Sequence, residues 1–157
     1  MISFLFVCAG NICRSPALAA YLQKLVNEKG LKDKVFVDSC ALTPSFLGAP
    51  ADPRIVAAAH KRGVHIDHKA KLFEQAYFKV FNYILAVNHE SLKKLQEMAH
   101  TDEEKAKVHL ASEFSALYKD QDMGDPYFNG DEGFEKILDM SEEIAREIFS
   151  KLLSAYQ

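Results

Sequence analysis

The sequence predicts an α/β fold, a parallel β-sheet that helices cover on both faces. Two patterns carry this prediction. Short apolar runs typical of buried strands alternate with longer segments whose apolar residues recur every three or four positions, as on one face of a helix. Such alternation favours parallel strands, because each crossover places a helix on a face of the sheet. With 157 residues, the chain predicts a single domain over residues 1–157.

The first half of the chain predicts two strands and two helices. Proline is favoured in the first turn of a helix and glycine just after its end, so Pro16 and Gly30 delimit the first helix. Asp52 is a favourable N-cap for the second helix, and Gly63 ends it. The expected elements are a strand over 2–7, a helix from Pro16 to Gly30, a strand over 34–39, a loop over 41–53 and a helix from Pro53 through His60.

The second half predicts a helical stretch, two strands and two longer helices. The last helix is the clearest, because its apolar residues keep helical spacing from Phe134 to Leu152. The run Asp102-Glu103-Glu104 is typical of a solvated helix start. The expected elements are a helical stretch over 73–80, a strand over 83–87, a helix over about 89–99, a strand over 108–110 and the C-terminal helix.

Composition excludes several classes of function. A formal net charge of -3 gives no electrostatic reason to expect nucleic acid or an anionic membrane as a partner. No apolar segment approaches the length of a membrane span. Three cysteines, an odd number, make a disulfide scaffold a poor explanation and favour a cytoplasmic setting, with secretion without a cleaved signal left open. A monomer or weak dimer is expected.

The segment after the first strand combines several groups that favour a bound anion. Cys8 ends the apolar run, a five-residue loop follows, and Arg14 precedes the start of a helix. Loop amides, a guanidinium and a helix N-terminus all favour negative charge, and ligands of parallel sheets bind beyond the carboxyl ends of the strands. The expected phosphate-binding residues are Ala9, Gly10, Asn11, Ile12, Cys13, Arg14 and Ser15.

Within this loop, Cys8 is the expected nucleophile. Its surroundings favour the thiolate, which can attack phosphorus and form a phosphocysteine. Arg14 has the planar fork that holds two phosphate oxygens at once. Gly10 and Asn11 are the residue types that most easily adopt a positive φ, which a loop with inward amides requires. Ser15 is expected to donate a hydrogen bond to the thiolate, to cap the helix, or both.

Displacement at phosphorus also requires an acid that protonates the leaving oxygen. Asp125 is the best candidate, because Pro126 restricts its backbone and the aromatic residues Tyr127 and Phe128 could wall a substrate pocket. A plain Asp-Pro turn is the alternative, and sequence spacing does not rank Asp125 above the other aspartates.

These residues resemble the low-molecular-weight protein tyrosine phosphatase family. The resemblance rests on the segment Val7 to Pro16 and on the distant Asp125-Pro126-Tyr127. Further matches occur in order along nearly the whole chain, at Asp38-Ser39, Gly48, Asp52-Pro53-Arg54, His68 and Tyr83-Ile84-Leu85.

The resemblance implies a three-layer, flavodoxin-like fold with a four-stranded parallel sheet, and hydrolysis of phosphotyrosine in proteins. It implies that Cys8 is the nucleophile, Arg14 the phosphate clamp and Asp125 the general acid and later the base. It also implies that Asn11 is left-handed and that Ser39 and His68 support it, although His68 could be a surface histidine. No metal or other cofactor enters this mechanism.

Departures from the family concern specificity. The family often has an aromatic residue where this chain has Ser45, so either Phe46 forms that wall of the pocket or the pocket is more open. Asn88 replaces a common aspartate. A reversible disulfide between Cys8 and Cys13 is expected under peroxide, with a packing role for Cys13 as the alternative.

Three rival functions fit these residues less well. An arsenate reductase needs further cysteines to relay a disulfide, and no cysteine follows Cys40. Protein arginine phosphatases tend to have threonine where this chain has Ile12, a side chain with less polar room for a guanidinium. A non-catalytic phosphopeptide-binding module would lose the nucleophile or the acid, whereas Cys8 and Asp125 are both present.

Overall fold

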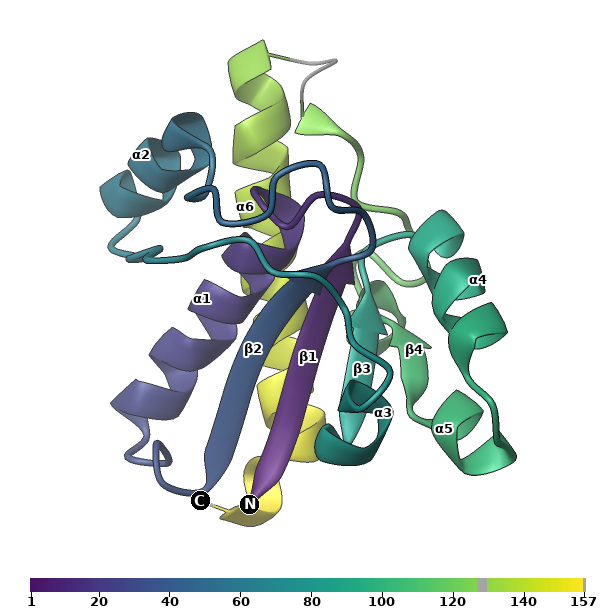
Figure 1. Ribbon diagram of the computed structural model, residues 1–157. Helices are drawn as coiled ribbons and strands as arrows, with labels where there is room; N and C mark the ends of the chain where they lie inside the picture. Colours follow the sequence, from purple (N-terminus) through teal and green to yellow (C-terminus); the bar gives the residue numbers. More distant parts are fainter. Residues whose placement is uncertain (127–129, 157) are drawn as a thin grey trace.

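A four-stranded parallel sheet forms the centre of the protein, with strand order β2-β1-β3-β4 (Figure 1). The computed structural model describes residues 1–126 and 130–156. The strands are β1 (Ile2–Cys8), β2 (Val35–Ala41), β3 (Tyr83–Ala86) and β4 (Val108–Leu110). The expected three-layer, flavodoxin-like fold class is confirmed.

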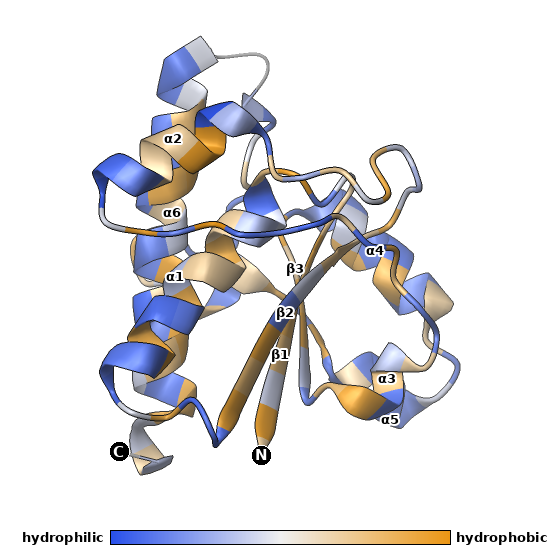
Figure 2. Ribbon diagram, turned by 60° about the vertical axis from the view of Figure 1, so that its left-hand side comes forward, coloured by the Kyte–Doolittle hydropathy of each residue, from blue (hydrophilic) through white to orange (hydrophobic). Residues whose placement is uncertain are grey.

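Helices cover both faces of this sheet (Figure 2). One face carries the long helices α1 and α6, with α2 packed against α6, and the other face carries the shorter helices α3, α4 and α5. Their bounds are α1 (Arg14–Glu28), α2 (Pro53–Lys61), α3 (Tyr77–Val80), α4 (His89–Met98), α5 (Asp102–Ala106) and α6 (Gly130–Leu152), with 3-10 helices η1 (Ala111–Phe114) and η3 (Ser154–Tyr156). No helix among the described residues has the length and hydropathy that crossing a membrane requires.

The side chains of β1 alternate between two hydrophobic clusters. Phe4, Phe6 and Cys8 belong to the cluster under α1 and α6, whereas Leu5 and Val7 belong to the cluster under α3 and α4. Successive side chains of a strand point to opposite faces, so the period of two fixes the direction of Cys8. Cys8 therefore ends β1 on the side from which α1 starts.

The predicted helix boundaries are largely confirmed. Gly30 follows α1 with a left-handed φ of 68°, which only glycine adopts without strain. The Asp52 side chain accepts a hydrogen bond from the Arg54 amide at 2.8 Å and caps α2. At α5, Thr101 and Glu104 form a reciprocal capping box.

The helix predicted over 73–80 is too long, because helical structure begins only at Tyr77. The preceding residues pair instead with the end of β2. The Ala41 amide donates to the Lys71 carbonyl at 2.7 Å, and the Phe73 amide donates to the Ala41 carbonyl at 2.7 Å. The backbone of this segment is therefore extended and not helical. Its pairing with β2 brings residues 68–73 next to the loop that follows β1.

Candidate active site

A small cavity of about 130 Å³ lies at the carboxyl end of β1. Its walls come from three separate parts of the chain: the loop after β1, the loop after β2 and the segment before α6. The lining residues are Cys8, Ala9, Gly10, Asn11, Ile12, Cys13, Arg14, Phe46, Asp125 and Pro126. The cavity thus brings together most of the side chains that the sequence predicts for a phosphate site.

Five carbonyl groups from Cys8 to Cys13 are bonded to groups outside the cavity. Neighbouring segments and the first turn of α1 supply the donors. The pairs are Leu42 N to Cys8 O, Thr43 N to Ala9 O, His68 Nε2 to Asn11 O, Asp52 N to Ile12 O and Ala17 N to Cys13 O. In a trans peptide the C=O and the following N–H point in opposite directions. The amides of the residues that follow these carbonyls therefore face the cavity, an arrangement that suits an anion.

Cys8 lies at the floor of this cavity, in contact with two donors. Its Sγ atom lies 2.8 Å from Ser15 Oγ and accepts a hydrogen bond from the Asn11 amide at 3.2 Å. Ser15 Oγ also accepts a hydrogen bond from Asn11 Nδ2 at 2.8 Å, which leaves the hydroxyl hydrogen for the sulfur. Both contacts place hydrogen-bonding groups next to the sulfur atom. Ser15 does not cap α1, because the N-cap position belongs to Cys13.

Asn11 is the buried centre of the loop. It is left-handed with a φ of 58° and has no exposed surface. Its Nδ2 atom also donates to Ser39 Oγ at 3.0 Å, and its Oδ1 atom accepts from the Lys71 amide at 3.1 Å. Buried polar groups need such partners, and here they hold a strained backbone conformation in place. Gly10, by contrast, does not adopt a positive φ.

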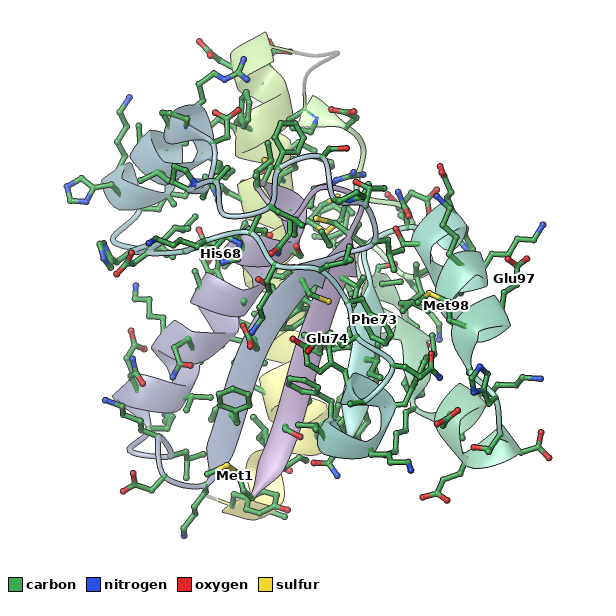
Figure 3. The ribbon with its side chains drawn as sticks, in the orientation of Figure 1. Met1, His68, Phe73, Glu74, Glu97 and Met98 are labelled. Atoms are coloured by element: carbon green, nitrogen blue, oxygen red, sulfur yellow. The ribbon has the colours of Figure 1, made fainter. Side chains whose placement is uncertain are left out.

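His68 supports the same loop from the segment between α2 and α3 (Figure 3). Its Nε2 atom lies 2.8 Å from the Asn11 carbonyl oxygen. A carbonyl only accepts, so Nε2 carries the hydrogen in this contact. Burial lowers the pKa of His68 below its ordinary value, and the hydrogen bond to Asn11 partly opposes that shift. The half-buried ring is therefore a neutral donor at neutral pH.

Arg14 begins α1 and reaches across the cavity toward the segment before α6. Its Nη1 atom donates to the Met123 carbonyl at 3.0 Å. A guanidinium has five N–H donors, so this bond fixes its orientation and leaves other donors for phosphate oxygens. Lysine, with one flexible ammonium, would not hold both partners in a fixed plane.

Phe46 lines the same cavity and covers Gly10. A Cβ atom on Gly10 would lie 2.9 Å from Phe46 Cδ2, closer than carbon atoms normally approach. A side chain at position 10 would therefore force the Phe46 ring to move. Phe46 lines this cavity with 44 % of its surface exposed, and its role as the wall for a substrate ring stays a prediction.

Asp125 lines the cavity together with the neighbouring Pro126. The strand order explains its position, since the chain returns to the carboxyl edge of the sheet after β4 before it enters α6. Tyr127 and Phe128, the other predicted pocket residues, lie outside the described residues.

All three cysteines are free thiols in the structure. Burial, followed by the charge of Cys8, raises the pKa of Cys13 to about 12 and also raises the pKa of Cys40. Both thiols therefore remain protonated at neutral pH, and a protonated thiol is a poor nucleophile. The disulfide between Cys8 and Cys13 stays a prediction.

Sequence reasoning missed two backbone groups of the site. These are the Lys71 amide on Asn11 and the Met123 carbonyl on Arg14. Every residue type except proline offers an amide, and every residue a carbonyl, so the pattern of side chains held no signal for either. In residues 1–126 and 130–156, no cluster of His, Cys, Asp or Glu has the arrangement of a metal site.

Comparison with known proteins agrees with this geometry. The family model described as "Low molecular weight phosphotyrosine protein phosphatase" matches residues 3–157. A low molecular weight protein-tyrosine-phosphatase of Streptomyces coelicolor is 37 % identical over 139 residues, which are 87 % of this chain and 85 % of that protein. The low molecular weight phosphotyrosine protein phosphatase of Sus scrofa is 32 % identical over 151 residues, 96 % of this chain and 95 % of that protein.

Among solved structures, the protein tyrosine phosphatase of Entamoeba histolytica, crystallised with Hepes in its active site, superposes with a TM-score of 0.93. It is 29 % identical in sequence, and the match covers 100 % of both chains. Both the sequence relatives and this structure thus match over most or all of their length.

Proposed function

Because the chain belongs to the low molecular weight phosphotyrosine protein phosphatase family, we propose that Cys8, Arg14 and Asp125 carry out its reaction. The protein is a protein-tyrosine phosphatase, which hydrolyses the phosphate ester of phosphotyrosine in proteins. The observation that carries the assignment of residues is the position of Cys8 Sγ, at the floor of the cavity and within 2.8 Å of Ser15 Oγ.

The phosphate group binds in the cavity between the loop amides and the guanidinium of Arg14. The amides and the guanidinium stabilise the negative charge on the phosphate oxygens in the transition state. They are already held in place before the substrate binds. The bond from Arg14 to the Met123 carbonyl supports this role, because an oriented guanidinium has less rotational freedom to lose.

In the first chemical step, the Cys8 thiolate attacks phosphorus. The S–P bond forms and the bond from phosphorus to the tyrosyl oxygen breaks, while Asp125 transfers its proton to that oxygen. The products of this step are the phenol of tyrosine, a phosphocysteine at Cys8 and the carboxylate of Asp125.

In the second step, water attacks the phosphocysteine and Asp125 accepts a proton from that water. The S–P bond breaks, inorganic phosphate forms and the sulfur leaves as a thiolate. The hydroxyl of Ser15 and the amide of Asn11 both donate to this sulfur, so they stabilise it as a leaving group.

The aromatic ring of the substrate is expected to lie against Phe46 at the mouth of the cavity. A cavity of about 130 Å³ has room for the phosphate but not for the rest of a peptide. The ring of Phe46 is half exposed beside it, which suits offset or edge-on packing of a phenyl ring.

Replacement of the nucleophile tests the proposal. Cys8→Ser should abolish hydrolysis of p-nitrophenyl phosphate and of a phosphotyrosine peptide, yet still bind vanadate. In the wild-type protein, acid quenching during turnover should leave a phosphoryl group on the peptide that contains Cys8, detectable by mass spectrometry. Residual turnover by Cys8→Ser, or a phosphoryl group elsewhere, would contradict the assignment.

A further inference from the structure

The side-chain amide of Asn11 is one link in a closed ring of hydrogen bonds that extends beyond the cavity. Asn11 Nδ2 donates to Ser39 Oγ at 3.0 Å, and the Ser39 amide donates to Asp38 Oδ1 at 2.8 Å. The Lys71 ammonium pairs with Asp38 Oδ2, and the Lys71 amide donates back to Asn11 Oδ1 at 3.1 Å. The nitrogen and the oxygen of the buried Asn11 side-chain amide are thus both connected to the ion pair between Lys71 and Asp38.

The ring joins two segments that are far apart in the sequence. Asp38 and Ser39 lie on β2, whereas Lys71 lies on the extended segment before α3. Hydrogen bonds from the Ala41 amide to the Lys71 carbonyl and from the Phe73 amide to the Ala41 carbonyl hold the backbone of this segment against the end of β2. The ion pair with Asp38 holds the Lys71 side chain against the same strand. Lys71 is therefore bound to β2 by both its backbone and its side chain.

We propose that Lys71 and Asp38 are positioning residues of the phosphatase reaction: their ion pair fixes the Lys71 amide against Asn11 and so keeps the Asn11 amide directed at Cys8. This inference rests on the proposed function of Cys8. Neither side chain lines the phosphate cavity, so neither acts by touching the phosphate group.

Two steps connect the ion pair to the reacting sulfur. The Lys71 amide holds Asn11 Oδ1, and Asn11 in turn donates its own amide to Cys8 Sγ at 3.2 Å. Asparagine tolerates the φ of 58° at Asn11 better than most residues with a side chain, but the conformation still carries strain, which the surrounding bonds offset. Loosening one of those bonds lets the amide turn away from the sulfur and the phosphate.

The exposure of the pair separates this role from simple stabilisation. The Lys71 side chain is 44 % exposed and that of Asp38 is 26 % exposed. Ion pairs in such surroundings add little to the free energy of unfolding, because water and salt screen them. Loss of the pair should therefore change catalysis more than stability.

The experiment replaces each partner and compares kcat/KM, the inhibition constant of inorganic phosphate and the melting temperature. Lys71→Met and Asp38→Asn should each lower kcat/KM by roughly tenfold, because misplaced groups near a reacting centre cost about that much or more. The phosphate inhibition constant should rise in parallel, while the melting temperature falls by no more than about 2–4 °C.

Three controls make the result specific. Lys71→Arg keeps the pair and should stay within about twofold of wild type. Lys69→Met makes the same change two residues away, on an exposed side chain, and should also stay at the wild-type level. The double variant Lys71→Met/Asp38→Asn should be no worse than either single variant, because both remove the same interaction.

Two outcomes would overturn the inference: Lys71→Met with wild-type kcat/KM, or a lower melting temperature with unchanged kcat/KM for the folded protein. Failure of the proposed function looks different, since Cys8→Ser would then retain turnover. If Cys8→Ser is inactive and Lys71→Met is fully active, only the positioning role is lost.

Discussion

The ring of Phe46 packs directly on the backbone of Gly10, so closely that a Cβ atom at position 10 would lie 2.9 Å from Phe46 Cδ2. This contact joins the loop after β1 to the loop after β2 and sets one wall of the phosphate cavity. The φ of Gly10 is not positive, so the effect of a side chain at position 10 depends on whether the Phe46 ring can move.

Gly10→Ala should displace the Phe46 ring and weaken its packing on the substrate. An aromatic pair contributes about 0.5–1.5 kcal/mol, so kcat/KM for a phosphotyrosine peptide should fall by a factor of roughly 2–10. In a Phe46→Ala background the same change should have little further effect. A full additional loss there would show that Gly10 acts independently of Phe46.

Asp125→Asn should slow esters with poor leaving groups far more than activated ones. General acid catalysis typically contributes about 10²–10⁴-fold, and an activated leaving group needs no proton. The measurement compares kcat/KM for phenyl phosphate and for p-nitrophenyl phosphate. The matched control is Asp122→Asn. The carboxylate of Asp122 is bonded to His89 at 2.6 Å, and its replacement should slow the two esters equally. Equal slowing of both esters by Asp125→Asn would remove it from the acid role.

The cysteines should differ sharply in reactivity. Cys13 and Cys40 are almost fully buried, and burial raises the pKa of both, that of Cys13 to about 12. Only thiolates react readily with iodoacetamide, so Cys13 and Cys40 should stay unlabelled in the native protein at pH 8, and any label should fall on Cys8, the candidate nucleophile. Phosphate should slow that labelling, and concentrated guanidinium chloride should expose all three thiols. Native labelling at Cys13 would contradict this account.

Acid should destabilise the fold through His68. Burial lowers the pKa of His68 in the native state below its ordinary value of 6.5, so the unfolded chain binds the proton more tightly. The contribution of His68 is therefore complete above the unfolded pKa and declines as the pH falls through it.

The test measures the free energy of unfolding in urea at pH 7.5 and pH 5.5. His68→Gln keeps a donor for the Asn11 carbonyl but does not titrate, so it should lose less stability on acidification than the wild type does. Identical pH dependence in the two proteins would exclude His68 as the source.

The sequence by itself predicted the fold class, which is confirmed, and grouped the candidate nucleophile with the candidate phosphate-binding residues. Cys8 ends a buried strand, and Arg14 and Ser15 start the helix after one short loop, so their proximity follows from the chain itself. Periodic apolar residues likewise predicted α1, α4 and α6, because a helix must bury one face.

The tertiary structure alone decided how distant segments complete this loop. Phe46 on Gly10, the Met123 carbonyl on Arg14 and the Lys71 amide on Asn11 are contacts across the edge of the sheet. Two of these contacts use backbone groups that nearly every residue carries, so no pattern of side chains in the sequence predicts them. The helix predicted from residue 73 was wrong for the same reason, since pairing with Ala41 outweighed local helix propensity there.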